Sequence, residues 1–194
     1  MRTFLIALAV SVIGTAAPLS AQMPVRPFKL GLSAGPTFVT GEDRDFYGTG
    51  FHVQGSVAVP MPAWSMVLRA DAMYHHIGGR NRSTQTFPGG PDTLLIGDLS
   101  LLGLTANALF YTGSATSLIR PYVLAGFGPY RIENKATLYG QPTTATATKM
   151  GVTGGLGMTV NALVTRLFVE ARVHNVFADG GSARVYPITI GLFF

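Results

Sequence analysis

The last ten residues of the chain, 185–194, alternate strictly between two kinds of side chain. Large apolar or aromatic residues take every second position, and smaller or mixed residues lie between them; the large ones are Tyr186, Ile188, Ile190, Leu192 and Phe194. Because successive side chains of a β-strand point to opposite faces, this pattern predicts a strand with one strongly apolar face. An apolar end of this kind would fray or pair with another edge in water. We therefore expect that face to lie in a nonpolar environment.

The same alternation recurs along the chain and predicts an all-β meander of eight strands. The expected strands are 28–38, 51–59, 64–75, 94–111, one that begins with 120–128, 149–160, 166–174 and 185–194. The alternation does not settle which residues of the fourth and fifth strands face inward. Long polar connections are expected at 40–48, 77–93, 134–146 and 178–184, and shorter turns at 60–63, 112–119 and 161–165. Connections that alternate in length in this way are typical of membrane-spanning barrels.

The chain begins with the features of a secretory leader. Arg2 precedes an apolar stretch at 4–13, and Leu19, Ser20 and Ala21 form a small-residue cleavage site before Gln22. We expect residues 1–21 to be a cleaved signal peptide and residues 22–194 to form one barrel domain. An apolar stretch this short does not cross a bilayer as a helix, which needs about 20 residues. The mature chain has no other long apolar run, so export is the expectation.

The composition narrows the classes of function. The chain has no cysteine, which excludes a disulfide framework and a thiolate metal site. Its formal charge of +5 is scattered without a basic run, so a nucleic-acid partner is not expected. Only 12 % of the residues are charged and 47 % are hydrophobic, too few charges for an ordinary solvated surface.

The charges indicate which face of the sheet is inside. In the clear strands all of them lie on the mixed face and none on the apolar face; they are Lys29, Arg69, Asp71, Lys149, Glu170 and Arg172. A narrow eight-stranded barrel holds small residues and a few opposed charges in its lumen, so we expect the apolar face to meet lipid. Four aromatic residues near strand ends are expected in girdles at the membrane interfaces: Trp64, Tyr74, Tyr122 and Tyr186.

Three segments and the chain end carry a family resemblance. Residues 104–111, 120–128 and 167–174, together with Phe194, resemble the small OmpA-like and OmpX-like outer-membrane barrels. The resemblance implies an eight-stranded antiparallel up-and-down transmembrane β-barrel, monomeric, in contact with outer-membrane lipid and lipopolysaccharide. It also implies that Phe194, with Leu192 and Ile190, is an assembly signal read by the barrel-assembly machinery. The peptidoglycan-binding domain of full-length OmpA has no counterpart here, so cell-wall anchoring does not carry over.

Five charges are the expected polar site. Arg69, Asp71, Glu170, Arg172 and Lys149 should form one network in the lumen, because buried charges are costly unless they are paired. We interpret this network as packing that fixes the register and blocks leakage. The alternative is a gate on a narrow path for small solutes.

The four histidines do not predict catalysis or a metal site. Glu170 and His174 share a face but lie about 13 Å apart along an extended strand, so they do not pair. His75 and His76 point to opposite faces and are expected at the headgroup level at the end of the third strand. The lipid-A deacylase barrels have a His-x-Ser element, and the sequence after His174 lacks that serine. No cofactor is expected.

Glycine-rich stretches resemble fragments of phosphate-binding loops at 126–128 and 154–157. Such a loop needs a helix after the strand, and no helical period follows either stretch. We therefore expect these glycines to permit curvature or to pack against large side chains.

The expected function is that of a structural or surface-interaction protein of the outer membrane without enzymatic activity. Two alternatives stay open: a narrow-lumen channel for small solutes, and a soluble periplasmic barrel that binds a lipophilic ligand. The charged and polar loop residues are interpreted as solvated, with contact to lipopolysaccharide phosphates or host surfaces as the alternative; they are Glu42, Asp43, Asp45, Arg80, Asn81 and Arg82. The sequence does not identify the partner of the loops.

Overall fold

The structure is a computed structural model that describes residues 28–40, 47–79, 95–114, 116–138, 141–161, 165–178 and 181–194. The expected signal peptide at 1–21 and its cleavage site lie outside these residues. The charged loop residues between 41 and 46 and between 80 and 94 also lie outside them.

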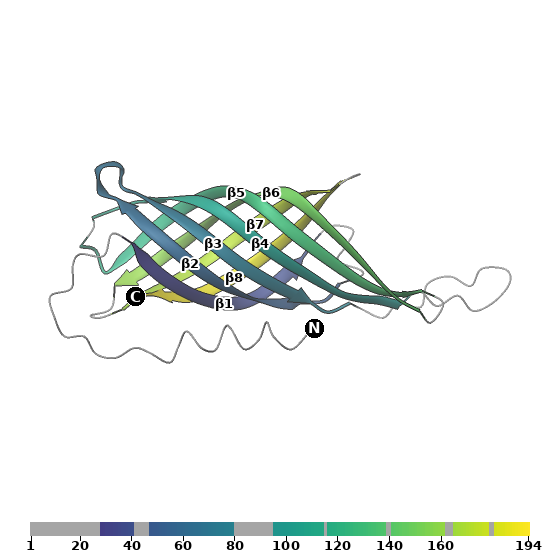
Figure 1. Cartoon of the computed structure of the whole chain (residues 1–194). Coiled ribbons are helices and arrows are strands. Elements are labelled where there is room, and N and C mark those ends of the chain that lie inside the picture. The colour runs from purple at the N-terminus through teal and green to yellow at the C-terminus, as the bar shows by residue number, and fades with distance from the viewer. Residues whose placement is uncertain are drawn as a thin grey trace, which may run out of the picture.

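Eight antiparallel strands close into a barrel, as the alternating pattern predicts (Figure 1). They are β1 (Lys29–Val39), β2 (Gly50–Met61), β3 (Met66–Ile77), β4 (Leu95–Tyr111), β5 (Ile119–Leu138), β6 (Gln141–Asn161), β7 (Arg166–Ala178) and β8 (Gly181–Phe193). Each strand pairs with the next in sequence, and β8 returns to pair with β1. Closure leaves no free sheet edge, which satisfies the backbone hydrogen bonds all around the wall.

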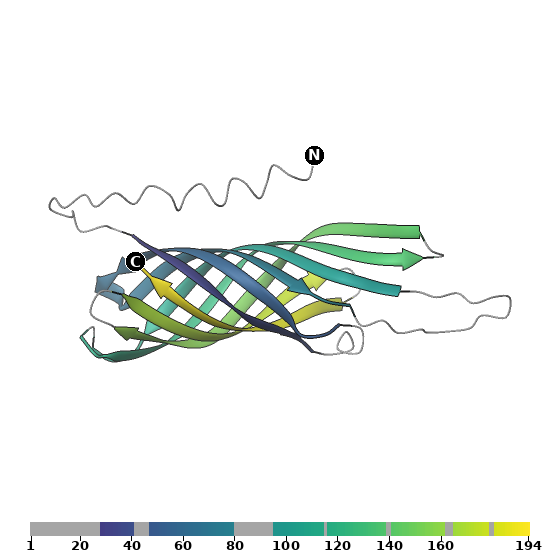
Figure 2. The same ribbon diagram turned by 90° about the horizontal axis from the view of Figure 1, so that it is seen from below.

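Two of the expected long loops are instead parts of strands. β5 and β6 stay paired from Ile119 with Val160 up to Leu138 with Gln141, so most of the predicted loop 134–146 is a β-hairpin. Both faces of that hairpin are exposed at 143–148, and Figure 2 shows the two strands running past their neighbours. Likewise, β7 and β8 pair up to Ala178 with Gly181, within the predicted loop 178–184. At 134–146, Thr residues support extended pairing as well as a loop, and this composition misled the prediction there.

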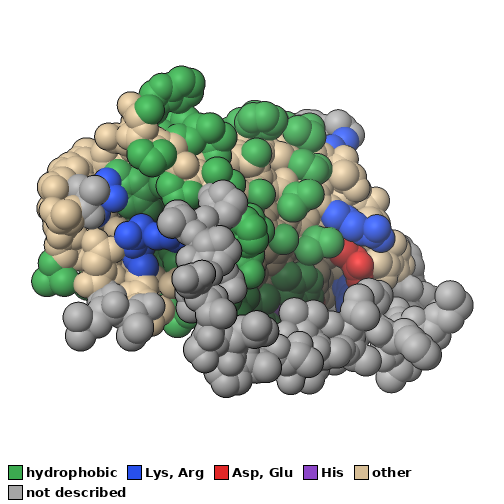
Figure 3. All heavy atoms as spheres, turned by 60° about the vertical axis from the view of Figure 1, so that its left-hand side comes forward, with side chains coloured by type: hydrophobic (Ala, Val, Ile, Leu, Met, Phe, Trp, Pro, Cys, Tyr) green, Lys and Arg blue, Asp and Glu red, His purple; other side chains and the backbone are tan. Residues whose placement is uncertain are grey.

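The two faces of the wall follow the predicted alternation. Along β8, Ile188, Ile190, Leu192 and Phe194 are exposed, while Thr189 and its alternate neighbours are buried. The structure also settles the two open strands: Leu101, Gly103, Thr105, Asn107 and Leu109 of β4 face inward, as do Tyr122, Leu124, Gly128 and Tyr130 of β5. Figure 3 shows hydrophobic side chains gathered over the wall, with basic side chains toward the two ends.

Two of the aromatic residues expected in girdles face outward and one faces the lumen. Trp64 is 71 % exposed and lies in a short 3-10 helix, η2 (Pro62–Trp64), between β2 and β3 rather than within a strand. Tyr74 lies on the outer face of β3. Tyr122 is only 2 % exposed and points into the lumen, so its prediction as a girdle residue is wrong. Tyr122 is on the face of β5 that points into the lumen, and its position near a strand end does not show which face that is.

The strands are long enough to cross an apolar layer. The shortest, β1, has 11 residues, and at a tilt of about 40° such a strand reaches about 25–30 Å along the barrel axis. Among the described residues, no helix has the length and apolar character needed to cross a membrane.

Candidate functional site

A closed ring of four charged side chains occupies the middle of the lumen. Nε of Arg69 lies 3.0 Å from a carboxylate oxygen of Asp71, and Nη2 of Arg69 donates to Oε2 of Glu170 at 2.7 Å. Arg172 completes the ring, since Nη1 donates to Asp71 at 2.9 Å and Nη2 donates to Glu170 at 2.7 Å. All four side chains are fully buried. The ring is neutral overall, and each carboxylate meets two guanidinium groups.

The strand register explains why these residues meet. Arg69 and Asp71 are two residues apart on β3, and Glu170 and Arg172 are two residues apart on β7, so each pair shares an inward face. Strands β3 and β7 lie on opposite sides of the closed barrel, four places apart in the strand order. Asn107 on β4 adds a hydrogen bond from Nδ2 to Asp71 at 3.0 Å. The ring therefore joins opposite walls of the barrel through the lumen.

Lys149 is not brought to this ring. It pairs with Tyr130 in the β5–β6 ladder, whereas Glu170 pairs with Gly157 in the β6–β7 ladder. The two positions on β6 are eight residues apart, which is about 26 Å along an extended strand. No ion pair between Lys149 and the ring occurs in the described part of the chain.

Three buried histidines form a second polar layer, nearer the end of the barrel where β1 ends. His52 and His75 both place Nδ1 at 3.0 Å from the Thr37 hydroxyl, and their rings lie 5.2 Å apart. Because a hydroxyl has a single proton, it donates to only one of these nitrogens, and the other Nδ1 must carry the proton and donate to Thr37. Nε2 of His52 contacts the Thr189 hydroxyl at 2.9 Å.

His174 joins this layer from β7. Its Nδ1 lies 2.8 Å from the Tyr130 hydroxyl, and its ring packs edge-on against His75 at 5.7 Å between centroids. The expectation that His75 sits at the headgroup level is wrong, because His75 is fully buried in the lumen. His76, on the other face, is half-exposed and 3.9 Å from Asp98. The alternation along each strand already places His52, His75 and His174 on the inward face. Whether the three rings come close to one another depends on the register between strands, which the sequence does not show.

In the described part of the chain, the three histidines of this layer contact hydroxyl groups and one another, and no carboxylate contacts them. Within the described ranges, no group of three or more His, Asp or Glu side chains is placed to hold a metal ion. The histidine partners are hydroxyl groups of threonine and tyrosine, and the two carboxylates of the lumen are held by arginines. The arrangement fills space and gives each of the three imidazoles at least one polar partner, although Nε2 of His75 has none among the described residues.

Aromatic rings and glycines close the remaining space. A Cβ at Gly103 or at Gly151 would lie 2.8 Å from the ring of Tyr130, so this ring fits between two positions without side chains. Phe168 and Phe193 stack at 4.8 Å between centroids on the other side of the ion ring. Gly157 faces Tyr122 in the same way as Gly103 faces Tyr130. Gly157 therefore packs against a large side chain, which is one of the two roles expected for the glycines at 126–128 and 154–157.

The comparisons with known proteins concern the fold. No family model matches the sequence, and no curated protein matches it at sequence level. Solved structures do match: Neisserial surface protein A has 16 % identity and a TM-score of 0.60, over 86 % of this chain and 96 % of that one. A major outer membrane protein from Thermus thermophilus has 11 % identity and a TM-score of 0.60, over 86 % and 98 %.

A third match is Ail, the attachment invasion locus protein of Yersinia pestis, with 13 % identity and a TM-score of 0.51 over 86 % of this chain and 97 % of that one. At these identities the likeness establishes the fold and nothing finer. The chain spans nearly the whole length of each of these barrels.

Proposed function

We propose that the chain is a small outer-membrane protein of the OmpA-like and OmpX-like type, exported by its signal peptide and inserted as a monomer. The observation that carries the proposal is the apolar outer face of the barrel. Its outer face exposes large apolar side chains on every strand, including Leu32 at 56 %, Leu104 at 58 % and Ile190 at 63 %. A soluble barrel would expose charges at these positions, because an apolar surface this extensive favours association in water.

The role that the geometry supports best is structural or surface-interacting, without enzymatic activity. The lumen holds an ion ring, a histidine layer and packed aromatic rings, and the charged and imidazole groups are engaged with one another or with hydroxyl groups. In the described part of the chain no carboxylate orients the three histidines, because Asp71 and Glu170 are held by arginines. Function then belongs to the ends of the barrel, above all to the β5–β6 hairpin, which is exposed on both faces at 143–148.

In this proposal the outer face contacts the lipid and lipopolysaccharide of the outer membrane. The barrel-assembly machinery reads the end of β8, where Phe194, Leu192 and Ile190 share the outer face. The end of the barrel with the β5–β6 hairpin faces outward from the cell, since β-barrels of this class keep short turns on the periplasmic side.

A narrow path for small solutes is the second candidate. The observation in its favour is the ion ring itself, because charged groups that exchange partners open a water path more easily than apolar packing does. Against it stands the side-chain filling of an eight-stranded interior. The ring is therefore proposed as a plug.

Cell fractionation tests the main proposal. The full chain is expected in the outer-membrane fraction and to migrate differently on a gel before and after boiling, because a closed membrane barrel resists unfolding in cold detergent. Recovery in the soluble periplasmic fraction without detergent would overturn the proposal and favour the ligand-binding barrel.

A further inference from the structure

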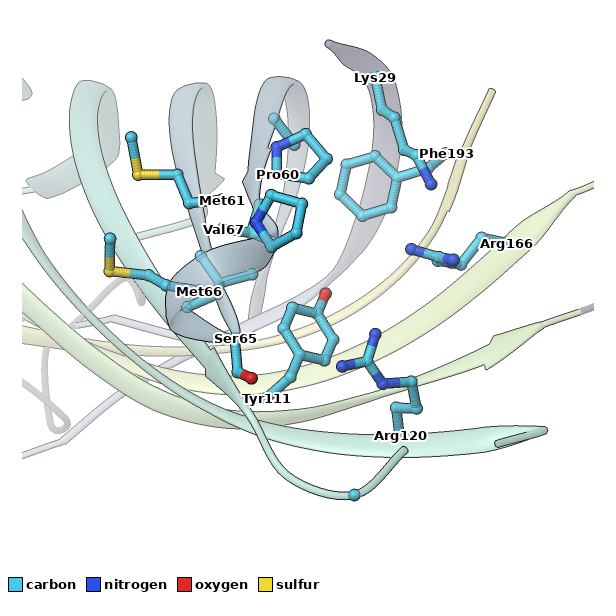
Figure 4. Close-up of a pocket in the computed structure, with 14 residues that line it drawn as sticks. Lys29, Pro60, Met61, Ser65, Met66, Val67, Tyr111, Arg120, Arg166 and Phe193 are labelled. Carbon is cyan, nitrogen blue, oxygen red and sulfur yellow. The ribbon is translucent and has the colours of Figure 1, made fainter. Parts of the chain in front are cut away.

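A cavity opens at the end of the barrel where β1 begins and β8 ends, which we name the terminal mouth. It has a volume of about 320 Å³, at the lower end of the range for sites that take small molecules. Pro60 and Val67 lie on one side of the cavity and the cations Arg120 and Arg166 on the other, while the Phe193 ring lies near Lys29 (Figure 4).

Three cations of this mouth come from three separate strands. Lys29 begins β1, Arg120 lies near the start of β5, and Arg166 begins β7. All three line the cavity, and Arg120 and Arg166 both act on Lys29 by like-charge repulsion. Like charges brought together on a partly desolvated surface disfavour one another unless an anion joins them.

No carboxylate of the described part of the chain neutralises these cations. None of the ion pairs between described residues involves Lys29, Arg120 or Arg166. The two lumen carboxylates, Asp71 and Glu170, are each engaged by two arginines in the ion ring. The ring and the mouth therefore differ in kind: the ring is balanced, and the mouth has an excess of positive charge.

The arginines of the mouth are held in place by contacts that leave donors free. The guanidinium of Arg120 lies 4.6 Å from the centre of the Tyr111 ring, and its buried Nε has no hydrogen-bond partner among the described residues. Nε of Arg166 donates to the side-chain oxygen of Asn161 at 2.7 Å. Stacking and a single hydrogen bond orient both groups before any ligand arrives, which lowers the cost of binding.

We propose that the terminal mouth binds a small amphiphilic anion, with a carboxylate or phosphate head at Lys29, Arg120 and Arg166. Its apolar body lies against Pro60, Val67 and Phe193. The planar donor fork of arginine suits both head groups. In the proposed orientation this site opens to the periplasm, but the inference rests on the geometry of the mouth and not on the membrane location.

The chain contains a built-in reporter for the test. Trp64 is the only tryptophan, and it ends the 3-10 helix whose first residue, Pro62, lines the cavity. The full chain in a neutral maltoside detergent is titrated with benzoate, phenyl phosphate, inorganic phosphate and benzyl alcohol, by Trp64 fluorescence and by calorimetry. Benzoate and phenyl phosphate share an aromatic body and differ in the head, so their ratio identifies the preferred anion. Benzyl alcohol keeps the body and lacks the charge.

Saturable one-to-one binding of at least one aromatic anion is expected, with benzyl alcohol and inorganic phosphate each much weaker. The variants Arg120→Gln and Arg166→Gln should each weaken that binding about tenfold, as expected for loss of a charge-assisted hydrogen bond. Arg184→Gln is the matched control. Arg184 is exposed near the opposite end of the barrel, where its Nε donates to the side-chain oxygen of Asn175.

Heat-modifiable mobility on a gel confirms that each variant is folded before its affinity is compared. Benzyl alcohol that binds as tightly as benzoate would overturn the proposal, since the cations would then contribute nothing. So would equal affinity in Arg120→Gln, Arg166→Gln and the Arg184→Gln control. Binding of inorganic phosphate as tight as that of phenyl phosphate would remove the apolar half of the proposal.

Discussion

Arg69 on β3 and Glu170 on β7 meet across the full width of the lumen, with Nη2 of the arginine 2.7 Å from Oε2 of the glutamate. The two residues are 101 positions apart in the sequence. Arg172 on β7 also contacts Asp71 on β3 at 2.9 Å, so the ring connects two strands on opposite sides of the barrel twice. A slip of one residue in either strand would turn its charges into the outer face, so the ring selects one register.

Removing one charge of the ring should be costly. Glu170→Gln leaves Arg69 and Arg172 buried without a full counter-charge, and loss of one partner of a buried pair typically costs about 3–5 kcal/mol. Unfolding in urea, followed from lipid vesicles by Trp64 fluorescence, measures the loss.

Glu133→Gln is the matched control for that experiment. Glu133 lies 3.7 Å from Lys135, with the Lys135 side chain 54 % and the Glu133 side chain 36 % exposed, and an ion pair in contact with solvent contributes about 0–1 kcal/mol. Equal stability of the two variants would show that the ring does not hold the barrel together.

The ring illustrates what the sequence could and could not predict. Alternation placed Arg69, Asp71, Glu170 and Arg172 on one face, and the cost of buried charge predicted that they would pair. The same reasoning placed Lys149 with them, because parity along a strand says nothing about depth in the lumen. Depth is set by the register between strands, and the register becomes visible only when the barrel is closed.

Glycines that face an aromatic ring should not tolerate a methyl group. At Gly103 a Cβ would lie 2.8 Å from the Tyr130 ring and 3.1 Å from Met73, so Gly103→Ala overpacks the lumen at a cost of about 1–3 kcal/mol. Gly55→Ala is the control, because nothing lies within 4 Å of the Cβ position there. Thermal shifts of gel mobility compare the two, and a Gly103→Ala barrel as stable as Gly55→Ala would contradict the packing.

A charge introduced on the outer face should lower the folding yield if that face contacts lipid. Leu104→Arg places a guanidinium at a site that is 58 % exposed on the middle of β4, and lipid there would make the change cost about 2–4 kcal/mol. Thr144→Arg is the control, since Thr144 is exposed on the β5–β6 hairpin beyond the wall. Folding yield into vesicles should fall for the first variant alone. A loss that is the same in both variants would argue against a lipid-facing wall.

The histidine layer and the β5–β6 hairpin mark two further limits of sequence reasoning. His75 next to His76 suggested a strand end, although His75 lies deep in the lumen against His52 and His174. At 134–146 the Thr-rich composition indicated a loop, although alternate Thr and Ala residues also suit a two-stranded ribbon. In both places local composition was the only signal, and pairing between strands decided the outcome.

The filled lumen should not conduct. The native chain in a planar bilayer is expected to be silent, because side chains, including the ion ring, fill the interior of an eight-stranded barrel. Steady conductance that changes in Glu170→Gln or Arg69→Ala would instead support the narrow-channel alternative, with the ring as its gate.

Deleting Phe194 should separate stability from recognition during assembly. Its backbone makes the last two hydrogen bonds between β8 and β1, with Leu30 at 2.9 and 3.2 Å, and its side chain is 56 % exposed on the outer face. Loss of two terminal hydrogen bonds costs about 1–3 kcal/mol, which the eight-stranded ladder should survive, so the truncated chain is expected to refold in detergent. In cells, the same truncation should lower the amount of outer-membrane barrel far more than a Thr144→Ala change in the hairpin. Normal insertion of the truncated chain in cells would show that the end of β8 closes the wall but is not the assembly signal.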